Sequence, residues 1–213
     1  LVQMDGSDHD WFEGRGPKPT LMVMIDDATN RTLARFYPTE DTASAYDIFE
    51  RYVRQHGLPR ALYPDRDSIY ICTREARIDE DLQGIGPETQ FARAMRELGV
   101  GLMPAFSPQA KGRVERRHQV FQDRLIKEMR LRGISTMEAA NDYLEREFLT
   151  ELNHRFTVPP RQPHNAHRPR PARSSLDLAL SWKEPRTVGK DWTIRWKNRR
   201  FQIPDRYAHL RLP

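Results

Sequence analysis

The stretch TLMVMIDDATNRTLARFYP, residues 20–38, limits the possible folds more than any other part of the chain. A continuous apolar run ends in two acidic residues and turn formers, and a second run follows after a tight connection near Ala28–Arg31. Two such runs on either side of a short turn predict an antiparallel β-hairpin over residues 20–38. Any fold assigned to this chain therefore has to contain a sheet that includes this hairpin.

The residues after the hairpin change to helical periodicity. The apolar positions that recur at helical spacing are Ala45, Tyr46, Phe49, Tyr52 and Val53. Asp41 or Thr42 is expected to cap the N-terminus of this helix, and Gly57 is expected to end it. The pattern therefore predicts a helix between these two boundaries.

Similar signals predict three further strands and three further helices. The strands are Val2–Asp5, 59–65 and 100–106. The helices run from Pro87 to Gly99, from Pro108 to about residue 131, and onward from a capping box at Ser135 and Glu138. The long middle helix is expected to bury Ala110, Val114, Phe121, Leu125 and Met129. The order of elements predicts the α/β class, with one mixed sheet flanked by helices.

Length and composition narrow the class of protein. With 213 residues the chain can bury one sizeable core and a small appendage. No apolar run approaches the length of a membrane span, and the single cysteine, Cys72, cannot form an internal disulfide. The chain opens with Leu-Val-Gln, so we expect it to be a fragment of a longer protein. A net charge of +5 suits an anionic partner, and a cytoplasmic protein is expected.

Residues 156–180 differ in composition from the rest of the chain. No acidic residue lies between Glu151 and Asp177, where five arginines and five prolines accumulate: Arg155, Arg161, Arg168, Arg170, Arg173, Pro159, Pro160, Pro163, Pro169 and Pro171. Repeated prolines favour extended backbone, so 156–180 is predicted to be a linker, either a solvated tether or an arm that tracks DNA. After it, residues 192–203 carry a hairpin signal, so residues 181–213 are predicted to begin a small β domain.

Three carboxylates are placed where they could carry chemistry. Asp5 ends the first predicted strand, Asp65 ends the strand after the first helix, and Glu115 lies in the first turns of a later helix. Strand ends bring side chains together at the edge of an open α/β sheet. Three converging carboxylates require a cation between them, and hard oxygen ligands select Mg²⁺ or Mn²⁺. Two such ions can support phosphoryl transfer.

Four motifs carry a resemblance to a known family. The stretch SPQAKGRVE resembles the Pro-Gln-x-x-Gly-x-x-Glu segment of retroviral integrases and the related insertion-sequence transposases. QMDGS and LYPDRDSIY resemble the two aspartate segments of the same families, and MVMIDDATNRTLARF resembles their core hairpin. The motifs occur in the family's order and cover about residues 1–155. The resemblance implies a ribonuclease H-like catalytic core over 1–155.

The resemblance also implies an activity and its partners. Asp5, Asp65 and Glu115 would be the catalytic metal ligands for two Mg²⁺ or Mn²⁺ ions. The substrates would be DNA element ends and target DNA, which are cut and joined during transposition by a bacterial, nucleoid-associated homo-oligomer. The hairpin of 192–203 is similar to the small β-barrel that often follows such a core. Helical domains that read DNA would precede residue 1.

Two departures from the retroviral pattern affect the expected site. The spacing between Asp65 and Glu115 is longer, and we interpret residues 71–86 as an inserted loop. Retroviral lysines that face DNA correspond to Gln119 and Gln122 here. The positions expected to contact DNA are Lys111, Arg113, Arg116, Arg117, Gln119, Gln122, Arg168 and Arg170.

Several alternatives remain open at this point. Asp67 could take the place of Asp65, and His118 is expected to be a packed or hydrogen-bonded histidine rather than a ligand. Residues 8–10, Asp-His-Asp, are expected to form a loop rather than a metal site. The alternative functions are a ribonuclease H-like nuclease or resolvase without strand transfer, and a catalytically silent DNA-binding module.

Overall fold

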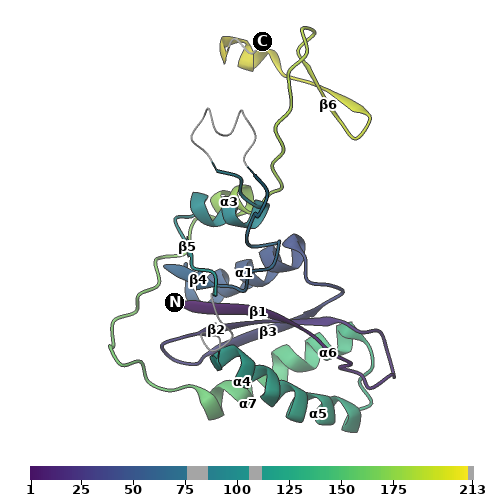
Figure 1. Ribbon diagram of the computed structural model, residues 1–213, viewed down its shortest axis with the longest axis vertical. Helices are drawn as coiled ribbons and strands as arrows, with labels where there is room; N and C mark the ends of the chain where they lie inside the picture. Colours follow the sequence, from purple (N-terminus) through teal and green to yellow (C-terminus); the bar gives the residue numbers. More distant parts are fainter. Residues whose placement is uncertain (76–85, 106–111, 211–213) are drawn as a thin grey trace. The chain divides into compact units, whose positions relative to one another are not determined.

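Strand β2 (Thr20–Asp26) lies inside the sheet and is buried along nearly its whole length. Neighbouring strands pair with both of its edges, and helices contact it from both faces, as Figure 1 shows. This double cover explains the uninterrupted apolar run of its sequence. The structure is a computed structural model that describes residues 1–75, 86–105 and 112–210.

The sheet is mixed and has five strands, as predicted. The other four are β1 (Val2–Asp8), β3 (Thr32–Tyr37), β4 (Ala61–Tyr63) and β5 (Gly101–Leu102). Their order in space is β3-β2-β1-β4-β5. The pairs β1–β2 and β2–β3 are antiparallel, whereas β1–β4 and β4–β5 are parallel. The predicted hairpin over 20–38 is therefore confirmed as β2 and β3.

Strand β5 is shorter than the predicted 100–106. Past its last residue the backbone still bonds to β4, because Met103 N donates to Leu62 O at 3.0 Å and Ala105 N donates to Pro64 O at 3.0 Å. Pro104 between them lacks an N–H, which is tolerated because alternate residues of an edge strand face away from the sheet. The end of β4 is thus held on its β5 side.

Helix α1 (Thr42–His56) covers one face of the sheet and has the predicted boundaries. Asp41 is its N-cap, and the carboxylate accepts a hydrogen bond from Ser44 N at 2.8 Å. The Ser44 hydroxyl in turn accepts a bond from Asp41 N at 2.8 Å, which completes a capping box. Gly57 follows with φ of +88°, a conformation that favours glycine.

Two long helical segments cover the opposite face of the sheet (Figure 1). The first comprises α4 (Gly112–Val120), a π-helical turn (Phe121–Leu125) and α5 (Ile126–Leu131). The second comprises α6 (Met137–Tyr143), a π-helical turn (Leu144–Phe148) and α7 (Leu149–Phe156). The buried side chains of the first segment include Val114, Phe121, Leu125 and Met129, as predicted, whereas Ala110 and Pro108 lie outside the described residues.

Two predicted helix starts were wrong by a few residues. Helix α3 (Gln90–Glu97) begins after Thr89, whose hydroxyl accepts a bond from Ala92 N at 3.0 Å, and not at Pro87. Helix α6 is capped by Thr136, which accepts from Ala139 N at 3.3 Å, and not by a box at Ser135. In both cases a nearby threonine with extended backbone provides the cap.

Strand β3 is an edge strand whose open side is occupied by two asparagine side chains. The Asn141 amide accepts from Phe36 N at 2.8 Å and donates to Phe36 O at 3.0 Å. Asn153 makes the same pair of bonds with Thr32 N at 2.8 Å and Thr32 O at 2.9 Å. The helices of this face therefore satisfy backbone groups of β3 that would otherwise lack partners.

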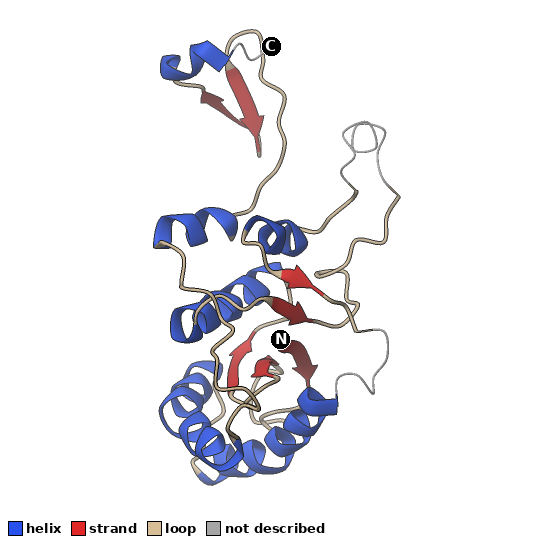
Figure 2. Cartoon of the chain, turned by 90° about the vertical axis from the view of Figure 1, so that its left-hand side faces the viewer, coloured by secondary structure: helices blue, strands red, loops and turns tan. Residues whose placement is uncertain are grey.

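The interpretation of 156–180 as a linker was wrong for most of its length. Arg168 forms a β-bridge with Leu58, with bonds of 2.9 Å in both directions, and the Tyr52 hydroxyl lies 2.9 Å from His167 Nε2. Helix α8 (Arg173–Ala179) follows and lies beside α3, as Figure 2 shows. The prolines do favour extended backbone, but it is fixed to the core by hydrogen bonds. Residues Leu1–Leu180 form one compact unit.

Arg168→Gln is expected to destabilise this unit by about 1–3 kcal/mol. Arg168 Nη2 donates to Leu98 O and Gly99 O, both at 2.9 Å, at the C-terminal end of α3, where a cation is favourable. Arg170→Gln is the matched control, because Arg170 is exposed. Urea unfolding followed by circular dichroism would measure both variants. Equal stabilities would mean that the segment is a tether after all.

Residues Ser181–Pro213 form a second unit. It contains a hairpin of β6 (Thr193–Trp196) and β7 (Arg199–Gln202), as predicted, and a 3₁₀ helix, Asp205–Leu210. Lys197 and Asn198 form the two-residue turn, and both have positive φ, which suits a tight β-hairpin. Most of the predicted inserted loop, residues 76–85 of 71–86, lies outside the described residues. Along the described ranges, no helix combines the length and apolar content needed to cross a bilayer.

Candidate active site

Asp5 lies on β1, and Asp65 follows the neighbouring parallel strand β4. In the β1–β4 pair, Val2 is opposite Leu62 and Gln3 is opposite Tyr63. Regular pairing ends there, so Asp65 lies two residues past the end of β4. Strand β1 continues to Asp8, so the prediction that Asp5 ends this strand was wrong. Both aspartates lie toward the end of the sheet at which β4 ends, where open α/β sheets carry their sites.

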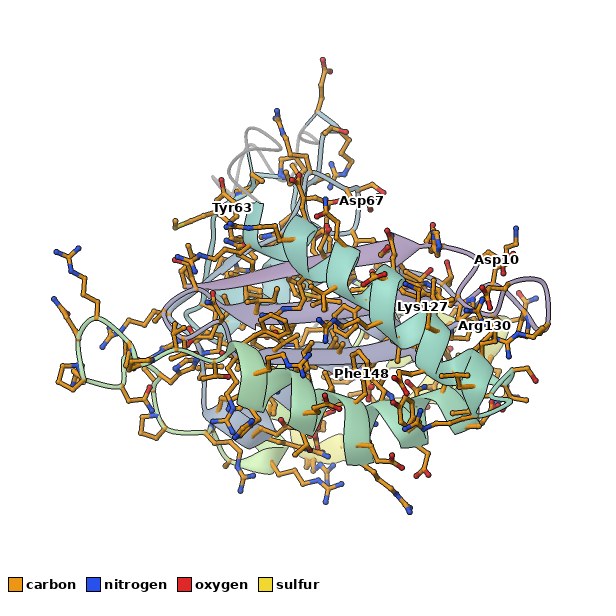
Figure 3. The ribbon with its side chains drawn as sticks, turned by 90° about the horizontal axis from the view of Figure 1, so that it is seen from below. Asp10, Tyr63, Asp67, Lys127, Arg130 and Phe148 are labelled. Carbon is orange, nitrogen blue, oxygen red and sulfur yellow. The ribbon has the colours of Figure 1, made fainter. Side chains whose placement is uncertain are left out.

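The chain turns sharply after Asp65. Asp65 Oδ1 accepts a bond from Asp67 N at 2.9 Å, and Asp67 Oδ1 accepts one from Ile69 N at 2.9 Å. These bonds shape two successive turns. Asp67 is exposed on the turn and lies at the same end of the molecule as Tyr63 of β4, as Figure 3 shows. Asp65, in contrast, is half-buried.

Helix α4 contacts β1 next to Asp5. His118 is buried, and its Nε2 lies 3.2 Å from Asp5 Oδ2. Val114 N donates to Gln3 Oε1 at 3.2 Å and ties the first turn of the helix to the same strand. Glu115 is exposed in this first turn, three residues before His118, and residues at that spacing share a helix face. The prediction that His118 is a hydrogen-bonded histidine is confirmed.

A complete metal cluster is not formed by these side chains alone. Within 1–75, 86–105 and 112–210, no three side chains of His, Cys, Asp or Glu are placed to hold one ion together. The structure thus brings Asp5 and Asp65 to one edge and places the Glu115 turn beside Asp5. The prediction of a loop at residues 8–10 is confirmed for His9 and Asp10 and wrong for Asp8, which ends β1 and pairs with Thr20. Asp10 Oδ1 accepts a bond from Gly14 N at 3.0 Å, and Asp10 lies on the same side as Lys127 and Arg130 in Figure 3.

Glu40 is a carboxylate near this site that the sequence analysis missed. It precedes the N-cap of α1, is half-buried, and its Oε1 accepts a bond from the Tyr70 hydroxyl at 2.9 Å. The pKa of Glu40 is raised to about 7, mainly because burial disfavours the charged form; the Tyr70 bond opposes this shift, and the negative charges of Asp65 and Asp5 add to it. The influence of both aspartates places Glu40 in their electrostatic environment.

A basic pocket lies at the other side of α4. Its lining residues are Ile25, Asn30, Arg113, Arg116, Arg117, Gln119, Val120, Asp123, Arg124 and Phe156. Arg113 pairs with Asp27 at 2.9 Å, and Arg116 Nε donates to Gly112 O at 2.9 Å. Gln122 lies in the π-helical turn that follows, and Lys111 is outside the described residues.

Arg117 is the unusual member of this pocket. It is buried, its guanidinium stacks 4.8 Å from the centre of the Phe156 ring, and burial lowers its pKa. Its Nη2 donates to Asn30 O at 3.4 Å, but its Nη1 has no hydrogen-bond partner. In the described part of the chain no carboxylate forms an ion pair with it. A buried cation without an anionic partner is costly, so an anionic ligand would be favourable here.

Two curated proteins match most of the chain. One is named as a transposase, y4bF, of Sinorhizobium fredii, and it is 39% identical over 207 residues, 96% of this chain and 44% of that protein. The other is the transposase for insertion sequence IS1202 of Streptococcus pneumoniae, 33% identical over 203 residues, 93% of this chain and 41% of that protein. The chain is similar in sequence to these two transposases. It spans less than half the length of either match.

A similar fold occurs in a solved viral intasome. In the cryo-EM structure of the simian T-cell lymphotropic virus intasome with the PP2A regulatory subunit B56 gamma, the matching chain has a TM-score of 0.56. It is 16% identical, and the match covers 86% of this chain and 55% of that chain. This likeness confirms the predicted ribonuclease H-like fold. No model of a protein family matches the chain.

Proposed function

We propose that the chain is the catalytic core of a transposase that cuts and joins DNA in a metal-dependent reaction. The observation that supports the proposal is the parallel pairing of β1 with β4, which runs toward Asp5 and Asp65, together with the contact of α4 with Asp5 through His118. The sequence relatives named as transposases support the same reaction class.

Asp5, Asp65 and Glu115 are the residues that would hold the metal ions. Their carboxylates are hard oxygen donors, which suit Mg²⁺ or Mn²⁺. When bound, two such ions would activate the attacking oxygen and stabilise the leaving oxygen. His118 restrains Asp5 by the contact with its Oδ2, so the orientation of that ligand is set before metal binds.

The reaction has two steps at phosphorus. Water attacks a phosphodiester at the element end, the bond from phosphorus to the 3′ oxygen breaks, and a 3′-hydroxyl is released. That hydroxyl attacks a phosphodiester of the target DNA and displaces another 3′ oxygen. Both steps are in-line displacements, so one set of ligands serves both and no protein nucleophile is required. Since an element has two ends, we propose that the active form is a homo-oligomer.

The pocket at Arg117 is proposed to hold a DNA phosphate. Its unpaired Nη1 is a donor without a partner, and a phosphate oxygen would satisfy it. Arg113 and Arg116 are exposed at the same pocket and add positive charge. Gln119 also lines it, so we retain Gln119 as a proposed DNA contact. Arg168 is not proposed as a DNA contact, because its guanidinium donates hydrogen bonds to the end of α3.

The function is tested by a joining assay with the 213-residue chain, supercoiled plasmid and a labelled DNA end bearing a free 3′-hydroxyl. The expected result is transfer of the label to plasmid with Mg²⁺ or Mn²⁺ and none with EDTA. Nicking without transfer would indicate a nuclease or resolvase. Binding of DNA with no metal-dependent cleavage would indicate a silent module, and either result would contradict the proposal.

A further inference from the structure

The regular pairing of β1 and β4 ends before it reaches the proposed ligands. The two strands are in register only at Val2–Leu62 and Gln3–Tyr63. Asp5 and Asp65 lie two residues further along, and their negative charges repel one another when no metal is bound. On the β5 side, Ala105 N still holds Pro64 O at 3.0 Å. On the β1 side, contacts other than the ladder have to set the spacing of the two aspartates.

Glu40 makes one of those contacts through Gly6, the neighbour of Asp5. The three atoms nearest to a Cβ built on Gly6 all belong to the Glu40 carboxyl group, and such a Cβ would overlap with Oε2. The Glu40 carboxylate therefore lies directly against the backbone of β1. It can do so only because residue 6 has no side chain.

Tyr70 connects the same carboxylate to the loop that carries Asp65. Its hydroxyl donates to Glu40 Oε1 at 2.9 Å, and its N donates to Asp67 O at 3.0 Å within the turn after Asp65. The ring is 2% exposed and packs edge-to-face on Phe91, with centroids 5.2 Å apart. A buried ring held in this way is a fixed attachment point for the turn.

We propose that Glu40 is a positioning residue that sets the spacing of Asp5 and Asp65, with Gly6 admitting its carboxylate and Tyr70 tying it to the Asp65 turn. The inference rests on the proposed metal site. Glu40 acts through the backbone beside one ligand and the turn beside the other. Removing a residue that orients metal ligands typically lowers metal affinity by about 10- to 100-fold.

Tyr70→Phe tests the connection, because it removes only the hydroxyl. We expect the Kd for Mn²⁺, measured by isothermal titration calorimetry on the full chain, to rise about tenfold. Tyr37→Phe is the matched control, since the Tyr37 hydroxyl donates to Asp47 Oδ2 at 2.7 Å away from the site. That variant loses an equivalent tyrosine–carboxylate bond and is expected to bind Mn²⁺ as the wild type does.

Two further variants separate position from charge. Glu40→Gln retains the shape and an acceptor for Tyr70, so it should bind Mn²⁺ nearly as tightly as the wild type, whereas Glu40→Ala should bind as weakly as Tyr70→Phe. Gly6→Ala displaces the carboxylate without changing it and should also match Tyr70→Phe. Because these residues act as one unit, the double variant with Gly6→Ala and Tyr70→Phe should bind Mn²⁺ no more weakly than either single variant.

The outcomes distinguish this inference from the proposed function. If the wild type and Tyr37→Phe bind no Mn²⁺, the proposed metal site itself fails. If the wild type binds and Tyr70→Phe binds equally well, the metal site stands and the role of Glu40 is refuted. If Glu40→Gln binds Mn²⁺ as weakly as Glu40→Ala, the charge of Glu40 rather than its position determines the Mn²⁺ affinity. That result would also overturn the inference.

Discussion

Asp65→Asn is expected to abolish DNA cleavage and joining while leaving the metal-free protein at least as stable as the wild type. The substitution removes one of several neighbouring negative charges, which costs nothing in the absence of metal. Asparagine can still accept the 2.9 Å bond from Asp67 N, so the turn after β4 is preserved. A purely structural aspartate would behave in the opposite way, because its loss would destabilise the metal-free protein.

The metal response of the same variant provides the measurement. At a hundredfold excess of Mn²⁺ over Kd the wild type should gain about 2.7 kcal/mol, or roughly 5–10 °C in Tm for a chain of this size. Asp65→Asn should lose most of that gain. Asp67→Asn is the matched control, since it makes the same change two residues later on an exposed turn, and it should keep both the gain and the activity. A full metal response in Asp65→Asn would remove Asp65 from the site.

Asn141→Leu is expected to destabilise the core by about 2–4 kcal/mol. Asn141 is 8% exposed, and the leucine would leave both Phe36 N and Phe36 O without the partners they have at 2.8 and 3.0 Å. Asn153→Leu is the comparison variant, and it should lower the free energy of unfolding by less. That asparagine makes the same bonds to Thr32 but is half-buried, so water can replace the amide and the loss should be smaller. Equal losses, or none, in urea unfolding would contradict this account of the strand edge.

The parts of the fold with a strong local signal could be predicted from the sequence. The β2–β3 hairpin follows from two apolar runs with a turn between them, and α1 follows from its periodicity and the Asp41 cap. The strands that carry Asp5 and lead to Asp65 could be predicted from local signals, although β1 extends past Asp5 and β4 ends before Asp65. In each case the information lies in residues that are close together in the chain.

The features that were missed depend on contacts between distant residues. Glu40 is one of two adjacent acids in a short connection, and its place depends on Gly6 having no side chain and on the hydroxyl of Tyr70. The Pro- and Arg-rich segment was assigned to a linker because its composition indicates extended backbone, which says nothing of whether that backbone bonds to a core. The bridge between Arg168 and Leu58 has no counterpart in local sequence.

The π-helical turn at Phe121–Leu125 sets the rotation of α4 relative to α5 around their common helix axis. A π turn holds an additional residue, and each residue of an α-helix accounts for about 100° of rotation around the axis. The turn therefore sets the rotational phase of Glu115 and His118 relative to the buried Ile126 and Met129. Loss of one residue here would leave α5 seated in the core and rotate the face of α4 that carries Glu115 and His118 away from Asp5. The length of this turn thus determines which side chains of α4 face Asp5.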